Sequence, residues 1–344
     1  MKEERLLRFE DFDFQGDSVE SVARGFSDGK RVHAYLITGP AGVGKRSLAG
    51  VMARSLLCTG SGEKPCNACP ACLQVMKEEH PDLVIVRPGV RVDPEGSSRS
   101  QSIVAEDIRA LNRIAGEESF TGRGKAIIIE QADKMLPAAA NSLLKTLEEP
   151  AADVMFLLLT ENRSMLLPTI VSRCRPVQLH PWPDDRLADF LREREVPEER
   201  IRETVPVCGG SAGKALQLAA DEEYWQKRRQ IREDFFGLER RSRILGVSAA
   251  WKDDKEAGDE LLDILEDMVR QLMLVRLGLR EKKSIEAFPT PWQRAATEAE
   301  LSVFAGLLDA VQETRKMRLS NVNWQAALEK LMLRLMEERT KWST

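Results

Sequence analysis

The stretch HAYLITGPAGVGKRS, from His33 to Ser47, decides the first fold assignment. Its apolar run AYLIT ends at Gly39 and predicts a buried strand, and the apolar spacing from Leu48 to Cys58 predicts a helix. Between them, GPAGVGKRS matches the phosphate-loop pattern G-x-x-x-x-G-K-[ST] except at its last position. Glycines let the backbone N–H groups of such a loop face phosphate oxygens, which the lysine neutralises. The stretch therefore predicts descent from a nucleotide-binding strand–loop–helix.

The end of this loop departs from the pattern in a way that disfavours magnesium. A Ser or Thr there would give Mg²⁺ a hydroxyl ligand, but Arg46 stands in its place, and a guanidinium has no lone pair to donate. Ser47 follows about 100° further round the helix and is not expected to substitute. Binding of ATP or ADP therefore stays open. The candidate nucleotide-binding residues are Gly39, Gly42, Gly44, Lys45, Arg46, Ser47 and Glu130.

The segment KAIIIEQADKM, from Lys125 to Met135, is typical of the strand that carries the second half of an ATPase site. An Asp–Glu pair normally ends this strand, but Glu130 and Gln131 stand here. Glu130 can still hold a hydrated metal. Gln131 can orient a water molecule, but it has no titratable carboxylate and cannot be a general base. Two independent departures predict little or no ATP hydrolysis by this chain.

Further short apolar runs predict a parallel α/β sheet, because helical stretches separate them. They lie at Leu83–Val86, Ala126–Ile129 and Val154–Thr160. The pattern changes near residue 180 at the proline-rich segment HPWPDDR, and only helical periodicity follows Asp221.

These changes of pattern divide the chain into three expected parts. We predict a P-loop-type α/β domain at 1–180, a small helical domain at 181–220 and an all-α domain at 221–344. In the last, one expected apolar stripe runs along Leu261, Leu262, Leu265, Met268, Val269, Leu272 and Met273, and another along Leu328, Leu331, Met332 and Leu335.

Four of the six cysteines fall close together with the spacing C-x7-C-x2-C-x2-C: Cys58, Cys66, Cys69 and Cys72. Thiolates two residues apart can share one tetrahedral ion, and four sulfur ligands favour structural Zn²⁺. The linker TGSGEKP is long enough to fold Cys58 back onto the others. We therefore predict a zinc module at about residues 58–72, with an iron–sulfur cluster or four buried thiols as alternatives. Cys174 and Cys208 stand apart and are interpreted as ordinary buried thiols.

Composition limits the class of protein. The 344 residues are 42% hydrophobic and 31% charged, with a net charge of −4, which is typical of a soluble globular protein. Tight, independent binding of nucleic acid would favour a basic chain. The N-terminus MKEERLLRFEDFDF is charged throughout, and no apolar run approaches the length of a membrane span. We expect a cytoplasmic protein with no membrane partner.

Several of these motifs together resemble one family, the AAA+ clamp-loader subunits of bacterial DNA polymerase III. HAYLITGPAGVGK resembles the family's P-loop entry, and the four-cysteine insertion follows the first helix as it does there. AANSLLKTLEEP (Ala139–Pro150) is the most specific stretch. SRCR (Ser172–Arg175) resembles the motif that carries the arginine finger, and NVNWQAALEKLMLRL resembles the end of the family's helical collar.

The resemblance implies an AAA+ domain with a zinc module, a lid domain and a collar domain that holds a hetero-pentameric ring. It implies partners: the motor subunits, the delta subunit and, through the assembly, the sliding clamp and primed DNA. Motor subunits of the family have intact ATP machinery, whereas the delta-prime type is typically degenerate. Arg46, Glu130 and Gln131 fit the delta-prime type, as does GSAGKAL, where Gly213 or Lys214 replaces a motor's arginine.

By the same resemblance, Arg173 is the candidate catalytic residue, an arginine finger that acts on the nucleotide of a neighbouring subunit. Its alternative role is a structural ion pair. Three further alternatives stay open: Thr160 is a sensor or a turn cap, Lys145 or Glu148 acts directly or only ends a helix, and Arg109 and Arg113 contact DNA or solvent. The rival functions are an active motor subunit, which Arg46 and Gln131 disfavour, and an independent zinc and nucleic-acid-binding protein.

Overall fold

The structure, a computed structural model, describes residues 7–90, 92, 101–151, 153–252, 258–320 and 322–340. The chain forms two compact units. The first comprises Met1–Pro183 and Gly210–Gly213, and the second comprises Asp184–Gly209 and Lys214–Thr344.

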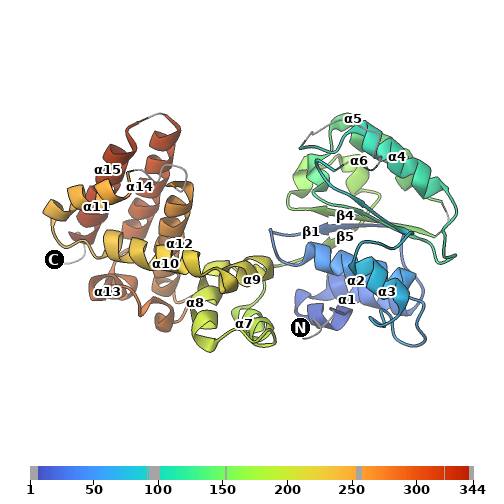
Figure 1. The fold of residues 1–344 in the computed structure, drawn as a ribbon, viewed down its shortest axis with the longest axis horizontal. Helices are drawn as coiled ribbons and strands as arrows, with labels where there is room; N and C mark the ends of the chain where they lie inside the picture. The colour runs from blue at the N-terminus through green and yellow to red at the C-terminus, as the bar shows by residue number, and fades with distance from the viewer. Residues whose placement is uncertain are drawn as a thin grey trace. The chain divides into compact units, whose positions relative to one another are not determined.

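The first unit is built on a sheet of five parallel strands, which confirms the predicted α/β class (Figure 1). The strands are β1 (Ala34–Thr38), β2 (Leu83–Val86), β3 (Lys125–Ile129), β4 (Val154–Thr160) and β5 (Arg175–Gln178). Their order across the sheet is β2-β3-β4-β1-β5. Every residue of β1 and β4 is buried, which explains their uninterrupted apolar sequences.

Helices cover both faces of this sheet. In chain order the elements are η1 (Phe9–Gln15), α1 (Asp17–Ser27), α2 (Lys45–Leu57), α3 (Pro70–Met76), α4 (Ala105–Gly116), η2 (Ala132–Lys134), α5 (Pro137–Glu148), η3 (Arg163–Met165) and α6 (Pro168–Val171). Helices α4, α5 and α6 lie over one face and α1, α2 and α3 over the other (Figure 1). On the first face, Ile108 of α4 and Leu143 of α5 join Ile127 and Phe156 of the strands in one buried core.

The edge strand β5 was not predicted. Only Val177 of its four residues is buried, so it lacks the apolar run that identified the other strands. It also contains Pro176, which is tolerated because β5 pairs on one side only, with β1. The pairing sets Tyr35 opposite Arg175 and Thr38 opposite Gln178, so both strands run from the same edge of the sheet.

The described elements after Pro183 are helical, as predicted. They are α7 (Asp184–Arg192), α8 (Glu198–Cys208), α9 (Ala212–Ala220), α10 (Glu222–Ile231), η4 (Arg232–Phe236), η5 (Arg241–Arg243), α11 (Ile244–Ala250), α12 (Gly258–Arg276), η6 (Lys282–Ile285), α13 (Thr290–Glu298), α14 (Leu301–Leu319) and α15 (Trp324–Thr340). The motif NVNWQAALEKLMLRL enters α15, and its first residue, Asn321, lies outside the described residues.

The apolar stripes of the second unit form its core. Leu262, Leu272 and Leu331 are fully or almost fully buried there, and Met273 is partly buried and packs against this core. Trp292 of α13 is also buried, and its indole Nε1 donates to the Phe236 carbonyl oxygen at 2.9 Å. The second unit is not divided further, so the separate lid (181–220) and collar (221–344) remain predictions.

Candidate functional site

The phosphate loop connects β1 to α2, and its glycines are required by its backbone. Gly39, Gly42 and Gly44 have φ values of +153°, +71° and +102°, where side chains are disfavoured. A Cβ on Gly39 would also lie 2.6 Å from the Leu179 carbonyl oxygen. The loop therefore keeps a phosphate-loop conformation, with Lys45 as the first residue of the following helix.

Two other segments of the first unit hold this loop. Trp182 Nε1 donates to the Val43 carbonyl oxygen at 2.9 Å, and the Gly213 N–H donates to the Gly42 carbonyl oxygen at 3.0 Å. A Cβ on Gly42 would lie 2.0 Å from the Ser211 hydroxyl oxygen. Ser211 and Gly213, from the start of the GSAGKAL segment, thus pack directly on the phosphate loop, and both are small.

The loop lysine is turned onto its own loop. Lys45 Nζ donates to the carbonyl oxygens of Gly39 at 2.7 Å and Pro40 at 2.6 Å. It also lies 3.7 Å from a carboxylate oxygen of Glu161, which follows β4. Burial lowers the pKa of Lys45, and Glu161 opposes that shift. In this arrangement the ammonium neutralises groups of its own chain.

Arg46 belongs to a cluster of two arginines and two glutamates, which we call the charge cluster: Arg46, Arg87, Glu78 and Glu130. Arg46 pairs with both Glu78 and Glu130. Arg87 Nε lies 3.2 Å from Glu130 Oε2, and its Nη2 lies 2.6 Å from Glu78 Oε2. Glu130, the candidate metal ligand, therefore has a guanidinium against each carboxylate oxygen, and a metal ion would have to displace them.

The charge cluster is assembled from four separate segments. Glu130 follows β3, Arg87 follows β2, Arg46 is in the first turn of α2, and Glu78 follows α3 beyond the cysteines. Sequence reasoning missed Glu78 and Arg87. Arg87 carried a usable signal, because it directly follows a predicted strand and the carboxyl ends of parallel strands share one edge. Glu78, in a left-handed turn with φ of +63°, carried none.

Gln131 and Thr160 lie nearby on the same edge of the sheet. Gln131 is exposed and has a left-handed backbone with φ of +47°, immediately before η2. The Thr160 hydroxyl donates to Asp133 at 2.6 Å and accepts from the Asn162 N–H at 3.0 Å. Thr160 therefore caps the turn after β4, which was one of its two expected roles. The other predicted residue, Ser47, is exposed on α2.

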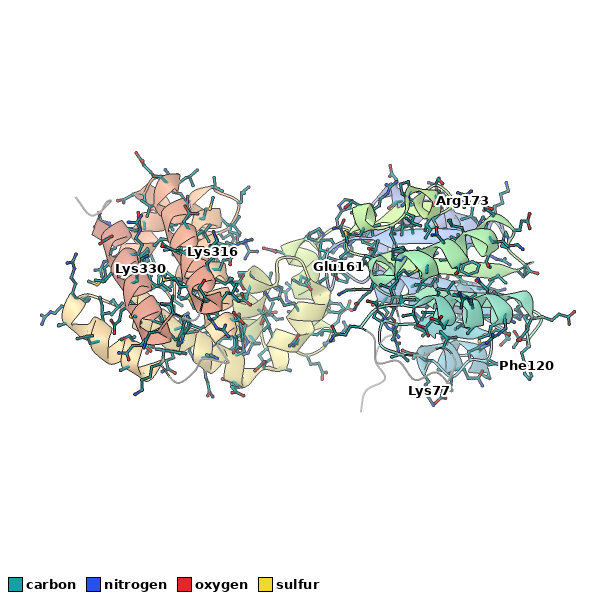
Figure 2. The ribbon with its side chains drawn as sticks, turned by 90° about the horizontal axis from the view of Figure 1, so that it is seen from above. Lys77, Phe120, Glu161, Arg173, Lys316 and Lys330 are labelled. Carbon is teal, nitrogen blue, oxygen red and sulfur yellow. The ribbon has the colours of Figure 1, made fainter. Side chains whose placement is uncertain are left out.

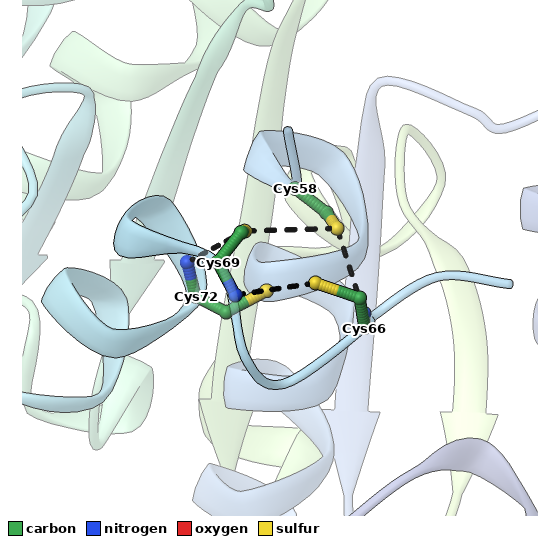
Figure 3. Close-up of side chains that lie close together, drawn as sticks. All are labelled: Cys58, Cys66, Cys69 and Cys72. Atoms are coloured by element: carbon green, nitrogen blue, oxygen red, sulfur yellow. Dashed lines mark hydrogen bonds between the residues drawn. The ribbon is translucent and has the colours of Figure 1, made fainter. Parts of the chain in front are cut away.

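The four clustered cysteines converge in space, although they come from the end of α2, a loop and the start of α3 (Figure 3). Their sulfur atoms all lie within 4.8 Å of one another, and those of Cys58 and Cys69 are 4.0 Å apart. Sulfurs around one zinc ion at about 2.3 Å would be about 3.8 Å apart. The set therefore fits a single tetrahedral ion after a small contraction. The structure thus brings together the four cysteines whose spacing predicted a metal site.

Hydrogen bonds favour the thiolate form in part of this set. Backbone N–H groups of Ala68 and Cys69 lower the pKa of Cys66. Burial acts against ionisation of Cys69, but bonds from Thr59 and the Cys72 N–H lower its pKa to about 5. Burial raises the pKa of Cys72. Metal ligation needs thiolates, and two of the four sites are prepared for that form.

A buried arginine lies beside the cysteines. Arg54 of α2 is 5% exposed, and its guanidinium donates to Asn67 Oδ1 at 2.6 Å and to the Leu7 carbonyl oxygen at 2.9 Å. Burial lowers the pKa of Arg54, and Cys72 opposes that shift. This positive charge would offset part of the negative charge of four thiolates around one ion.

Arg173 lies at the surface of the first unit, between α6 and β5 (Figure 2). Its side chain is 32% exposed and pairs with Glu148, the last residue of α5. Its Nη1 also donates to the Thr169 carbonyl oxygen at 2.8 Å. The structure thus connects the motifs LLKTLEEP and SRCR through one ion pair.

The remaining predicted residues have simpler surroundings. Cys174 and Cys208 are buried, as expected, and burial raises the pKa of each to about 12. Arg109 is exposed and lies 3.3 Å from Glu106 on its own helix. Lys145 is in the last turn of α5. Among the described helices, none combines the length and apolarity of a membrane crossing.

Comparison with known proteins gives a consistent result. The family described as "DNA polymerase III, delta subunit" matches residues 14–183. DNA polymerase III subunit delta' of Bacillus subtilis is 32% identical over 314 residues, which cover 89% of this chain and 91% of that protein. Subunit delta' of Haemophilus influenzae is 26% identical, over 92% and 94%.

The chain is also similar to another subunit type. DNA polymerase III subunit gamma of Buchnera aphidicola is 27% identical over 84% of this chain and 81% of its own length. Among solved structures, a gamma subunit-related protein of Thermotoga maritima matches 94% of this chain with a TM-score of 0.44 and 15% identity.

Proposed function

The chain belongs to the family of DNA polymerase III delta' subunits, and from that premise we propose that it is the delta'-type subunit of a replicative clamp loader. In this role it joins motor subunits and a delta subunit in a cytoplasmic hetero-pentamer, within the polymerase III holoenzyme. The assembly loads the sliding clamp onto primed DNA. The chain contributes an arginine to a neighbour's ATP site and hydrolyses little or no ATP itself.

The observation that carries this proposal is the pairing of Arg46 with Glu130. A motor needs magnesium between the first turn of α2 and the end of β3, and here a guanidinium and a carboxylate from these two positions neutralise each other. Gln131 adds a chemical reason, because its amide cannot take a proton from water. Bound ATP or ADP would have to do without the usual magnesium ligands.

The position of Arg173 supports an action on another subunit. Arg173 precedes β5, whereas the phosphate loop follows β1, and these two strands are parallel and in register. Arg173 and the phosphate loop therefore lie at opposite ends of β1, and the five residues of this strand span about 16 Å. Arg173 is too far from its own phosphate loop to serve it. Its planar, permanently charged group suits phosphate oxygens of a neighbouring nucleotide.

We propose that Cys58, Cys66, Cys69 and Cys72 hold one structural Zn²⁺. Four sulfur ligands leave no open position for water, so the ion would stabilise residues 58–72 and take no part in a reaction. The Sγ distances support this assignment over four ordinary buried thiols.

An active motor subunit is the alternative function. The similarity to a gamma subunit and the retained Gly39, Gly44 and Lys45 favour it. Turnover by the purified chain and copurification with motor subunits separate the two. We expect no ATP turnover by the chain alone, and stimulation when it joins the motors. Robust turnover by the isolated chain that disappears in Lys45→Ala would establish the motor instead.

A further inference from the structure

Arg173 of the SRCR motif is paired with Glu148, which belongs to the motif LLKTLEEP. Glu148 ends α5, and Arg173 follows α6, yet their side chains meet in an ion pair. Both are at the amino-terminal edge of the sheet, since α5 leads into β4 and Arg173 leads into β5. The surroundings of the pair distinguish incidental surface charge from a role in the proposed action of Arg173.

The chain positions of both residues are fixed by the core. Leu147, next to Glu148, is 1% exposed, and Cys174, next to Arg173, is 6% exposed. Both belong to the buried cluster that also contains Ile170 of α6 and Leu143 of α5. Because their neighbours are packed together, Glu148 and Arg173 are brought into reach by the fold itself.

Glu148 lies where a carboxylate does not stabilise its helix. Its presence there favours a role in holding Arg173. The carboxyl end of a helix carries partial negative charge, so an acidic residue there is unfavourable. Glu149 adds a second carboxylate directly after it. Arg173 offsets this charge, but the Glu148 side chain is still 49% exposed, so the pair remains open to solvent and to an incoming anion.

The guanidinium keeps donors available while it is held. Besides its bonds to Glu148 and the Thr169 carbonyl oxygen, its only other hydrogen bond within the described residues is a long one of 3.4 Å from Nη1 to the Ser172 hydroxyl. A guanidinium has five N–H groups, so at least two remain for an acceptor outside the chain. The Arg173 guanidinium can therefore stay paired with Glu148 while it donates to a phosphate.

We propose that Glu148 is the positioning residue for Arg173: it holds the guanidinium at the subunit edge in the orientation that meets a neighbour's nucleotide. This inference rests on the proposed function of Arg173. Long arginine side chains lose much rotamer freedom when they bind, and a guanidinium that is already held loses less at the moment of reaction. Exposed ion pairs are weak, so the contribution of Glu148 is smaller than that of Arg173.

The test is a double-mutant cycle in the assembled complex. The variants are Glu148→Gln, Arg173→Ala and the two together, and the readouts are kcat and KM for the ATPase stimulated by clamp and primed DNA. Glu149→Gln is the matched control, because it removes the adjacent exposed carboxylate. We expect Glu148→Gln to lower kcat about two- to fivefold with KM unchanged, and to have no effect when Arg173 is already alanine. Glu149→Gln should behave as wild type.

Three results would overturn the inference and leave the proposed function intact. Wild-type kcat in Glu148→Gln would show that the pair is incidental, and an equal loss with and without Arg173 would show that Glu148 acts on the fold alone. The same loss in Glu149→Gln would assign the effect to general surface charge. If Arg173→Ala itself left kcat unchanged, the proposed function would fail and this inference would fail with it. The kcat of this single variant therefore distinguishes failure of the proposed function from failure of the inference alone.

Discussion

The two edges of the central sheet use arginine in opposite ways. At the carboxyl-terminal edge, Arg46 is in the charge cluster and has two carboxylates and another arginine around it. At the amino-terminal edge, Arg173 has one half-exposed carboxylate and a carbonyl oxygen. Two carboxylates of its own chain oppose the charge of Arg46, whereas a single, half-exposed carboxylate opposes the charge of Arg173. Residue type alone therefore does not distinguish these two arginines; the carboxylates around them do.

The comparison fits the proposed function, in which the chain makes little use of a nucleotide of its own and acts on a neighbour's nucleotide. The phosphate loop keeps its backbone shape, since its glycines and its contacts to Trp182 and Gly213 also stabilise the first unit. What has changed is the charge at its end. The opposite edge needs no nucleotide of its own to present Arg173. The predictions below test whether the two edges are as independent as this arrangement suggests.

The largest effect is expected at the proposed zinc module, because metal binding there would be coupled to folding, and because α3, which holds Cys72, leads to Glu78 of the charge cluster. Cys69→Ser should reduce bound zinc from about one ion per chain to near zero and lower the free energy of unfolding by about 3 kcal/mol or more. Metal analysis and denaturant unfolding measure these effects. Cys174→Ser, outside the cluster, should retain its zinc. Full stability without zinc would exclude a structural role for the metal.

The next largest effect is expected at the amino-terminal edge of the sheet, where Arg173 lies. Arg173→Ala should leave assembly intact but lower the stimulated ATPase and clamp loading of the complex by about tenfold or more, below the roughly 10³–10⁵ known for single-site GTPases. Arg173→Lys should restore little, because an ammonium lacks the planar fork. Arg31→Ala is the matched control, since Arg31 also precedes a strand at this edge and pairs with Asp153 at 3.1 Å. Wild-type loading by Arg173→Ala would make Arg173 a structural residue.

A smaller effect is expected from removing Arg46 from the charge cluster at the carboxyl-terminal edge of the sheet. Arg46→Ser restores a hydroxyl where magnesium is usually held and leaves Glu130 with Arg87 alone. We expect ATP affinity to become magnesium-dependent and to rise roughly tenfold, about 1.4 kcal/mol. Titration with a fluorescent ATP analogue, with and without Mg²⁺, measures this. Adding Lys45→Ala should remove the gain. An affinity that ignores magnesium in Arg46→Ser would mean that the charge cluster does not control the site.

The smallest effect is predicted for the lysine itself. Lys45 donates to Gly39 and Pro40 and has little role if the site is unused. Lys45→Ala should therefore change the stimulated ATPase of the complex by less than about twofold. The same substitution in a motor subunit of the complex should remove most of the activity, which serves as the control. A large loss with Lys45→Ala in this chain would show that its nucleotide site contributes to the assembly.

Sequence reasoning succeeded where one residue type or period determines the structure. Four strands followed from apolar runs, and the cysteine set followed from its spacing, because burial and ligation leave few alternatives. It missed β5, which is polar because it lies at an edge, and it missed Glu78 and Arg87, whose role appears only when four segments meet. It also left the partner of Arg173 unidentified, since nothing in LLKTLEEP specifies that Glu148 lies against SRCR.

The contact between Gly213 and Gly42 has a consequence for how the protein is made. The first unit takes in Gly210–Gly213, so its chain leaves for α7 and α8 and then returns to cover the phosphate loop. During synthesis the loop emerges early, yet the bonds from Gly213 to Gly42 and from Trp182 to Gly210 must wait until residue 213 has left the ribosome. The sheet can assemble once β5 has emerged, but its phosphate loop is completed only after α8 has been made.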